Sequence, residues 1–146
     1  MRVVLDTNVL VAGLLTPHGA PGRIVDLMLQ GHILPCVDDR ILGEYRDVLN
    51  RPKFGFDATD VKTLQEYFEN DGIHVVAAPL GLSLPDPDDA MFVEVAHAAA
   101  AERLVTGNLR HYPASQRRNV RVVRPGEFMK LWEDSIRGTR PNDDSS

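Results

Sequence analysis

The sequence has a single cysteine, Cys36, among its 146 residues. One cysteine permits neither an internal disulfide nor a zinc site built from several cysteines, and it fits a reducing compartment. No apolar run approaches the roughly 20 residues of a membrane span, and the first residues lack the basic-then-apolar pattern of a signal peptide. These absences predict a cytoplasmic protein without a membrane segment.

The motifs of several common kinds of site are also missing. The stretch 19–22 (GAPG) is neither a dinucleotide-binding G-x-G-x-x-G nor a P-loop. The chain contains no H-E-x-x-H and no serine in a nucleophile elbow. One E-x-x-H is present at Glu94 and His97, but di-iron carboxylate bundles use two such motifs. We therefore interpret His97 as an ordinary structural histidine.

Short segments rich in Val, Ile and Leu alternate with segments of helical periodicity. This alternation predicts an α/β fold in which helices cover a parallel sheet. Strands are predicted at residues 2–6, 32–37, 73–77, 103–106 and 119–123. Helices are predicted at residues 8–15, 23–30, 38–50, 59–70, 90–101 and 125–136, the first with Asn8 as its N-cap. No linker divides the chain, so we predict one domain over residues 1–136 and a disordered tail over 137–146.

Carboxylates and other polar side chains gather where predicted strands end or the neighbouring helices begin. They are Asp6 after the first strand, Glu44 in the helix after the second, Asp86, Asp88 and Asp89 before the fifth helix, and Thr106 and Asn108 after the fourth strand. In open α/β sheets, ligands bind outside the carboxyl ends of the strands. This distribution predicts an oxygen-ligand site for a hard cation such as Mg²⁺ or Mn²⁺.

Each acid also has a simpler interpretation when it is taken alone. Asp6 could cap the helix that follows it, and Asp86, Asp88 and Asp89 could interact with a helix dipole. Glu44 could be a solvent-facing residue of its helix. The joint occurrence of these acids at strand ends favours a shared site, because caps have no reason to cluster there.

Four stretches together resemble the PIN domain: VVLDTNVL, ILGEYRDVLNRPKF, LPDPDDAMFVEVA and RLVTGNLRHYP. They are most similar to the branch of toxin components of toxin–antitoxin systems, the group that includes the VapC ribonucleases. The resemblance runs from about Met1 to Glu127, and its strength lies in the order of the four stretches, since DTN and TGN are each weak alone. It implies a PIN-like α/β/α sandwich with a central, mostly parallel sheet of about five strands.

The resemblance also implies a function and a site. The function is that of a metal-dependent endoribonuclease that uses Mg²⁺ or Mn²⁺ and leaves a 5′-phosphate and a 3′-hydroxyl. The implied catalytic acids are Asp6, Glu44 and Asp89, the metal ligands are Asp6, Glu44, Asp86 and Asp89, and the supporting residues are Asn8, Asp86, Thr106 and Asn108. The implied partners are RNA, a cognate antitoxin and a second copy of the chain in a homodimer.

Asn108 departs from the family pattern, because the family often has a fourth acid at this place. An amide can orient a water molecule but cannot neutralise the charge of a cation, so the second metal of a two-metal site is in doubt. Apart from the resemblance, the chemistry is coherent: a phosphodiester is repelled by carboxylates unless a divalent metal neutralises them, and that metal also lowers the pKa of a bound water.

A basic stretch follows the fourth predicted strand, although the chain as a whole has a net charge of −5. From residue 103 to residue 126 there is no acid, and the six basic residues are Arg103, Arg110, Arg117, Arg118, Arg121 and Arg124. We interpret Arg110, Arg117 and Arg118 as contacts to an RNA backbone, with Tyr112 available for base stacking. The alternatives are a solvated face or a docking surface for an acidic partner.

Two other functions remain open from the sequence. The first is a catalytically weak PIN-like module that binds RNA or a partner, which Asn108 favours. The second is a phosphotransfer domain, because Asp6 and Asn8 faintly resemble a D-x-D phosphatase motif; the chain lacks the aspartate two residues after Asp6 that this chemistry needs.

Overall fold

The fold is built on a central five-stranded sheet in the order β3-β2-β1-β4-β5. It is seen in a computed structural model that describes residues 1–138. All four strand pairings are parallel, which confirms the predicted α/β fold with a parallel sheet. The strands are β1 (Arg2–Leu5), β2 (Leu34–Val37), β3 (Ile73–His74), β4 (Arg103–Val105) and β5 (Val122–Val123).

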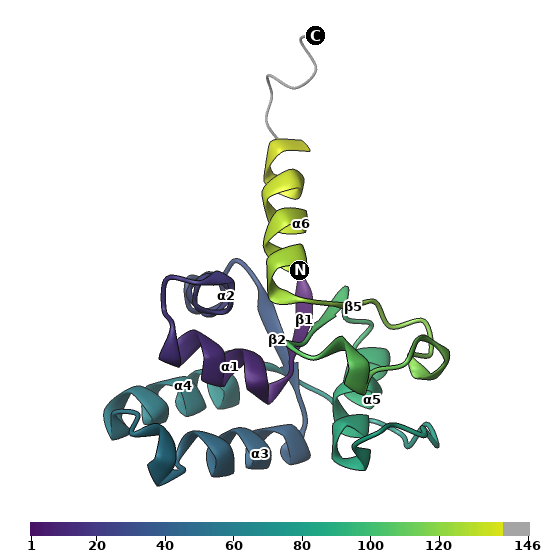
Figure 1. Ribbon diagram of the computed structural model, residues 1–146, viewed down its shortest axis with the longest axis horizontal. Coiled ribbons are helices and arrows are strands. Elements are labelled where there is room, and N and C mark those ends of the chain that lie inside the picture. The colour runs from purple at the N-terminus through teal and green to yellow at the C-terminus, as the bar shows by residue number, and fades with distance from the viewer. Residues whose placement is uncertain (139–146) are drawn as a thin grey trace, which may run out of the picture.

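Helices cover both sides of this sheet, as Figure 1 shows. The α-helices are α1 (Thr7–Leu15), α2 (Ala20–Leu29), α3 (Asp39–Leu49), α4 (Ala58–Asp71), α5 (Ala90–Ala98) and α6 (Pro125–Gly138). Helices α1 and α2 pack together, α6 packs on α2, and α5 lies on the other side against β1, β2 and β4. Helices α3 and α4 pack against each other.

The elements nearest the centre are buried on nearly all sides. Val3, Val4 and Leu5 of β1 have no exposed surface, which explains why this strand reads as a continuous apolar run instead of an alternating one. Helix α5 buries six consecutive residues, Met91 to Ala96, because it is enclosed by the sheet and α3. These two buried elements therefore support the residues at their ends, Asp6 after β1 and Asp89 before α5.

Several boundaries differ from the prediction, each for a local reason. Helix α1 begins at Thr7 because Asp6, and not Asn8, is its N-cap. Helix α2 begins three residues early, since Pro21 is well suited to a first helical turn. Strand β3 ends at His74, and Val76 beyond it is 99% exposed. Helix α6 continues to Gly138, and the rest of the predicted tail, residues 139–146, lies outside the described residues.

The order of the strands places a crevice between β1 and β4. The chain proceeds from β1 to β2 and β3 in one direction and then returns to β4 on the other side of β1. Such a reversal opens a crevice at the carboxyl ends of the two strands on either side of it. Asp6 follows β1 there, and its backbone N–H donates to the Val105 carbonyl at 2.9 Å. Among residues 1–138, no helix is long and apolar enough to cross a membrane.

Candidate active site

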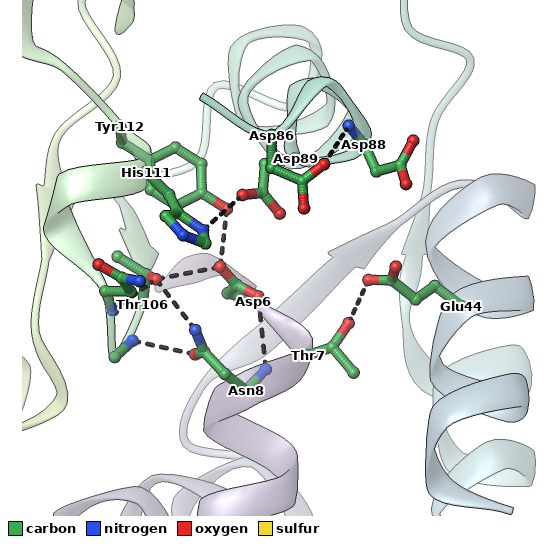
Figure 2. A network of polar contacts seen from close by, with 12 residues as sticks. Asp6, Thr7, Asn8, Glu44, Asp86, Asp88, Asp89, Thr106, His111 and Tyr112 are labelled. Atoms are coloured by element: carbon green, nitrogen blue, oxygen red, sulfur yellow. Dashed lines mark hydrogen bonds and ion pairs between the residues drawn. The ribbon is translucent and has the colours of Figure 1, made fainter. Parts of the chain in front are cut away.

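Asp6 lies at the centre of a polar network in the crevice between β1 and β4 (Figure 2). Its side chain is 5% exposed. Its Oδ2 atom accepts hydrogen bonds from the Tyr112 hydroxyl at 2.7 Å and the Thr106 hydroxyl at 3.0 Å. Its Oδ1 atom accepts the Asn8 backbone N–H at 3.4 Å, as an N-cap of α1. Asp6 is therefore both a helix cap and an oriented carboxylate in the crevice.

A second set of bonds ties the start of α1 to the segment after β4. The Asn8 side-chain amide donates to the Thr106 hydroxyl oxygen at 3.4 Å, and its oxygen accepts the Gly107 N–H at 2.9 Å. The Asn108 backbone N–H donates to the same Thr106 oxygen at 3.1 Å. The Asn108 side chain does not cap the short 3₁₀ helix η3 (Leu109–His111) that follows. These contacts agree with supporting roles for Asn8 and Thr106, which stay predictions.

Asp89 enters the crevice from the opposite wall. It ends the 3₁₀ helix η2 (Pro87–Asp89) and precedes α5, and it is 8% exposed. Its Oδ2 atom lies 2.9 Å from His111 Nδ1. Burial, followed by the charges of Asp6 and Asp86, raises the pKa of the Asp89 carboxyl from 3.8 to about 6, although His111 opposes the shift. Asp6 and Asp86 are thus close enough to Asp89 to disfavour its charged form.

Glu44 occupies the side of the crevice formed by α3. Its Oε2 atom accepts the Thr7 hydroxyl at 2.6 Å. Burial, followed by the charges of Asp6 and Glu44, raises the pKa of the neighbouring Tyr45 hydroxyl well above its ordinary value. A cleft of about 500 Å³ runs from Glu44 past Asp88. Glu44 is thus tied to Thr7, the residue that follows Asp6.

The donor set fits a hard divalent cation. Within residues 1–138, no three acidic, histidine or cysteine side chains converge into a ready-made metal site. Mg²⁺ commonly binds proteins through only one or two carboxylates, keeping water molecules and substrate phosphates as its other ligands. Asp6 and Asp89 offer two carboxylates whose mutual repulsion a cation would relieve. The chemistry of these residues is thus compatible with the predicted metal.

The predicted stacking role of Tyr112 is wrong. Its side chain has no exposed surface, and its hydroxyl is bound to Asp6. Burial and the charges of Asp6 and Asp89 raise the pKa of this hydroxyl well above its ordinary value, so it stays a proton donor. Tyr112 lies in a basic stretch, and such a stretch suggests exposed side chains. The fold instead buries Tyr112 beneath the crevice.

The three arginines proposed to bind RNA lie in different settings. Arg110 is exposed on η3. The Arg117 guanidinium donates to the Tyr112 carbonyl at 2.8 Å, and the Arg118 guanidinium donates to the Leu80 carbonyl at 3.2 Å. Arg117 and Arg118 therefore also hold the loop backbone, which their spacing in the sequence does not predict.

Sequence reasoning missed Thr7 and His111 beside the acids and gave Tyr112 another role. Thr7 bonds to Glu44, His111 to Asp89 and Tyr112 to Asp6. Thr7 carried a weak signal, since it is a polar residue between two apolar runs. His111 and Tyr112 carried none, because their partners are 22 and 106 positions away in the chain.

The raised pKa of Asp89 leads to a prediction about stability without metal. An acid with a raised pKa destabilises the fold as the pH rises from 3.8 to about 6, because the folded state resists ionisation. Asp89→Asn should therefore be more stable than wild type by about 1–2 kcal/mol at pH 7.5, and the difference should shrink towards pH 4. Urea unfolding in EDTA at both pH values measures this. Asp88→Asn, in the exposed part of η2, is the control, and a less stable Asp89→Asn at pH 7.5 would contradict the prediction.

The fold and the site define a class: α/β proteins with a carboxylate pocket at the point where the order of a parallel sheet reverses. A family model described as the PIN domain matches residues 2–110. The match covers most of the chain, and the chain belongs to the PIN domain family.

The chain is also similar to individual proteins over 85% or more of its length. "Uncharacterized protein MJ1680" of Methanocaldococcus jannaschii is 28% identical over 157 residues, covering 93% of this chain and 94% of the relative. The crystal structure of VapBC2 from Rickettsia felis, bound to a DNA fragment from their promoter, aligns with a TM-score of 0.59 at 16% identity. FitAcB from Neisseria gonorrhoeae aligns with a TM-score of 0.52 at 15% identity. Each alignment covers 85% of this chain and 98% of the other, and these likenesses establish the shared fold.

Proposed function

We propose that this PIN domain protein is a Mg²⁺- or Mn²⁺-dependent endoribonuclease that hydrolyses RNA phosphodiesters. The observation that carries the proposal is the approach of Asp6 and Asp89 from opposite walls of the crevice, close enough for Asp6 to help raise the pKa of the Asp89 carboxyl. Repelling carboxylates in a partly buried crevice are costly without a cation, so a pocket of this kind is suited to binding one.

In this proposal, each residue has a defined part. Asp6 and Asp89 hold the metal from opposite walls, and Glu44 and Asp86 are the further acidic ligands at the border of the site. The bound metal would neutralise the acids, polarise the phosphoryl group and lower the pKa of a water molecule. The Tyr112 and Thr106 hydroxyls fix the orientation of Asp6. Thr7 holds Glu44, whose carboxylate can accept a proton from the attacking water.

The partners follow from the family and from the basic stretch. We infer that the chain is the toxin of a toxin–antitoxin pair, that it acts in the cytoplasm and that it forms a homodimer. The fold it shares with VapBC2 and FitAcB and its toxin-like motifs support an antitoxin partner. Arg110, Arg117 and Arg118 supply positive charge for the RNA backbone, which offsets the acidic surroundings.

Asn108 favours one alternative, a PIN-like module that binds RNA or a partner with little catalysis. Asn108 occupies the sequence position at which the family often has a fourth acid, and an amide cannot neutralise the charge of a cation. In that case RNA would bind to the protein without being cut.

The ends of the reaction products test the proposal. Water-mediated hydrolysis with a metal needs no 2′-hydroxyl nucleophile, so we expect products with a 5′-phosphate and a 3′-hydroxyl. Purified protein would be incubated with labelled single-stranded RNA and Mg²⁺ or Mn²⁺, and the ends identified by ligation and phosphatase treatment. Products with a 2′,3′-cyclic phosphate would contradict the proposal, and binding without cleavage would favour the alternative.

A further inference from the structure

Arg40 bridges two buried acids on different elements. Its guanidinium lies 2.8 Å from Asp38 Oδ2, before α3, and 2.8 Å from Glu94 Oε1, in the middle of α5. Both carboxylates are almost fully buried, whereas the Arg40 side chain is about half exposed. Buried carboxylates require partners of this kind, because leaving one unpaired is strongly unfavourable. Glu94 belongs to the single E-x-x-H pair, which the proposed site does not use.

Glu94 has a second contact that joins a third segment to this group. Its Oε2 atom accepts the Leu80 backbone N–H at 2.9 Å. The Leu80 carbonyl in turn accepts the Arg118 guanidinium. Glu94 thereby links α3 and α5 to the segment that leads into η2. Asp86 lies just before η2, and Asp89 is its last residue.

The Arg40–Glu94 ion pair lies close in sequence to two acids of the proposed site, Glu44 and Asp89. Arg40 and Glu44 are four residues apart on α3, so they lie on the same face in adjacent turns. Glu94 is likewise a little more than one turn beyond Asp89. Between the two walls lies the 500 Å³ cleft, lined by Gly43 and Glu44 on one side and by Pro87 and Ala90 on the other. Within residues 1–138, Arg40–Glu94 is the ion pair that joins α3 to α5.

We propose that Arg40 and Glu94 are positioning residues that fix the separation between Glu44 on α3 and Asp89 at the start of α5, and through it the affinity of the site for a divalent cation. Helices α3 and α5 border this open cleft, and the Arg40–Glu94 ion pair joins them beside it, so this bond helps to set their spacing. This inference rests on the proposed function, because it assigns Glu44 and Asp89 to one metal-dependent site.

The experiment measures Mn²⁺ binding to the RNA-free protein by isothermal titration calorimetry. Glu94→Gln keeps the size of the side chain and removes its charge, and Arg40→Lys keeps the charge but cannot pair with two carboxylates as a planar guanidinium does. We expect an affinity about tenfold weaker for Glu94→Gln, the scale typical of residues that orient ligands, and a smaller loss for Arg40→Lys. All titrations are made well below the melting temperature of each variant.

A matched control separates positioning from general stability. Arg23–Glu133 is also a 2.8 Å ion pair between two helices, α2 and α6, away from the crevice. Arg23→Gln should leave the Mn²⁺ affinity unchanged. Hydrogen exchange without metal gives a second readout: in Glu94→Gln, amides of residues 86–91 should exchange faster while those of α2 do not change.

The outcomes distinguish this inference from the function on which it rests. A wild-type affinity that Glu94→Gln leaves intact, or faster exchange throughout the chain instead of at residues 86–91, would overturn the inference and leave the proposed function standing. A wild-type protein that binds no Mn²⁺ would contradict the proposed function and the metal part of this inference together. Weaker Mn²⁺ binding by Glu94→Gln with faster exchange confined to residues 86–91, and unchanged binding by Arg23→Gln, supports both.

Discussion

Asp6→Asn is expected to slow RNA cleavage on the order of 10³-fold, which corresponds to roughly 4 kcal/mol of lost transition-state stabilisation. The substitution removes the charge of Asp6, the most central of the proposed metal ligands, and almost none of its volume. An asparagine oxygen can still accept the Tyr112 and Thr106 hydroxyls that now bond to Asp6. The fold should therefore persist while the metal-binding charge is lost. Chelating the metal with EDTA should abolish cleavage by the wild-type protein as well.

The control for this experiment is another aspartate of the same domain. Asp26 is exposed on α2, and Asp26→Asn should cleave RNA at the wild-type rate. Melting temperatures in EDTA check that both variants are folded. A folded Asp6→Asn protein with more than a tenth of wild-type activity would remove Asp6 from the site. If Asp6→Asn melts far below wild type, the main role of Asp6 is to cap α1.

Tyr112→Phe should lower the cleavage rate about 10- to 100-fold, the range found when a group that orients a metal ligand is removed. The phenyl ring fills the same buried space, so only the hydroxyl that donates to Asp6 at 2.7 Å is lost. Asp6 would keep Thr106 as a donor but would no longer be held from two sides. The loss of one hydrogen bond should cost about 1 kcal/mol of unfolding free energy. Steady-state cleavage assays over a range of Mg²⁺ concentrations measure the effect.

Tyr67→Phe is the matched control for this variant. The Tyr67 hydroxyl donates to the Met28 carbonyl at 2.6 Å, a contact between α4 and α2 far from Asp6. It should cost similar stability and leave cleavage unaffected. If the two tyrosine variants lose stability equally and both keep full activity, Tyr112 supports the core and does not orient Asp6.

The positions of the main elements could be predicted from the sequence because each has a strong local signal. The buried strands β1 and β4 read as short runs of Val and Leu, and the order of the four motifs placed acids at their ends. Strand β3 and the extended residues after it differ from the prediction. Val75 still donates to the Val37 carbonyl, but Val76 has left the sheet, because the β-propensity of Val is outweighed where no neighbouring strand continues.

The contacts that complete the site could not be predicted in the same way. Tyr112 is buried beneath Asp6 and Arg40 bridges two acids because of where α3, α5 and the loop after β4 meet in space. Such contacts depend on the packing of distant segments, so neither hydrophobic periodicity nor motif spacing predicts them. The sequence therefore indicated which acids to consider, and only the fold relates Glu94 and Tyr112 to them.

The bonds to Asp6 have a consequence for how the protein is made. They join the sixth residue to Thr106 and Tyr112, which are 100 and 106 positions later. Synthesis proceeds from the N-terminus, and contacts between such distant positions form late. While translation has not yet passed β4, the strand β1 has only β2 beside it and Asp6 lacks both hydroxyl donors. A growing chain on the ribosome thus carries its acids unassembled, and the crevice comes into existence only when nearly the whole domain has been translated.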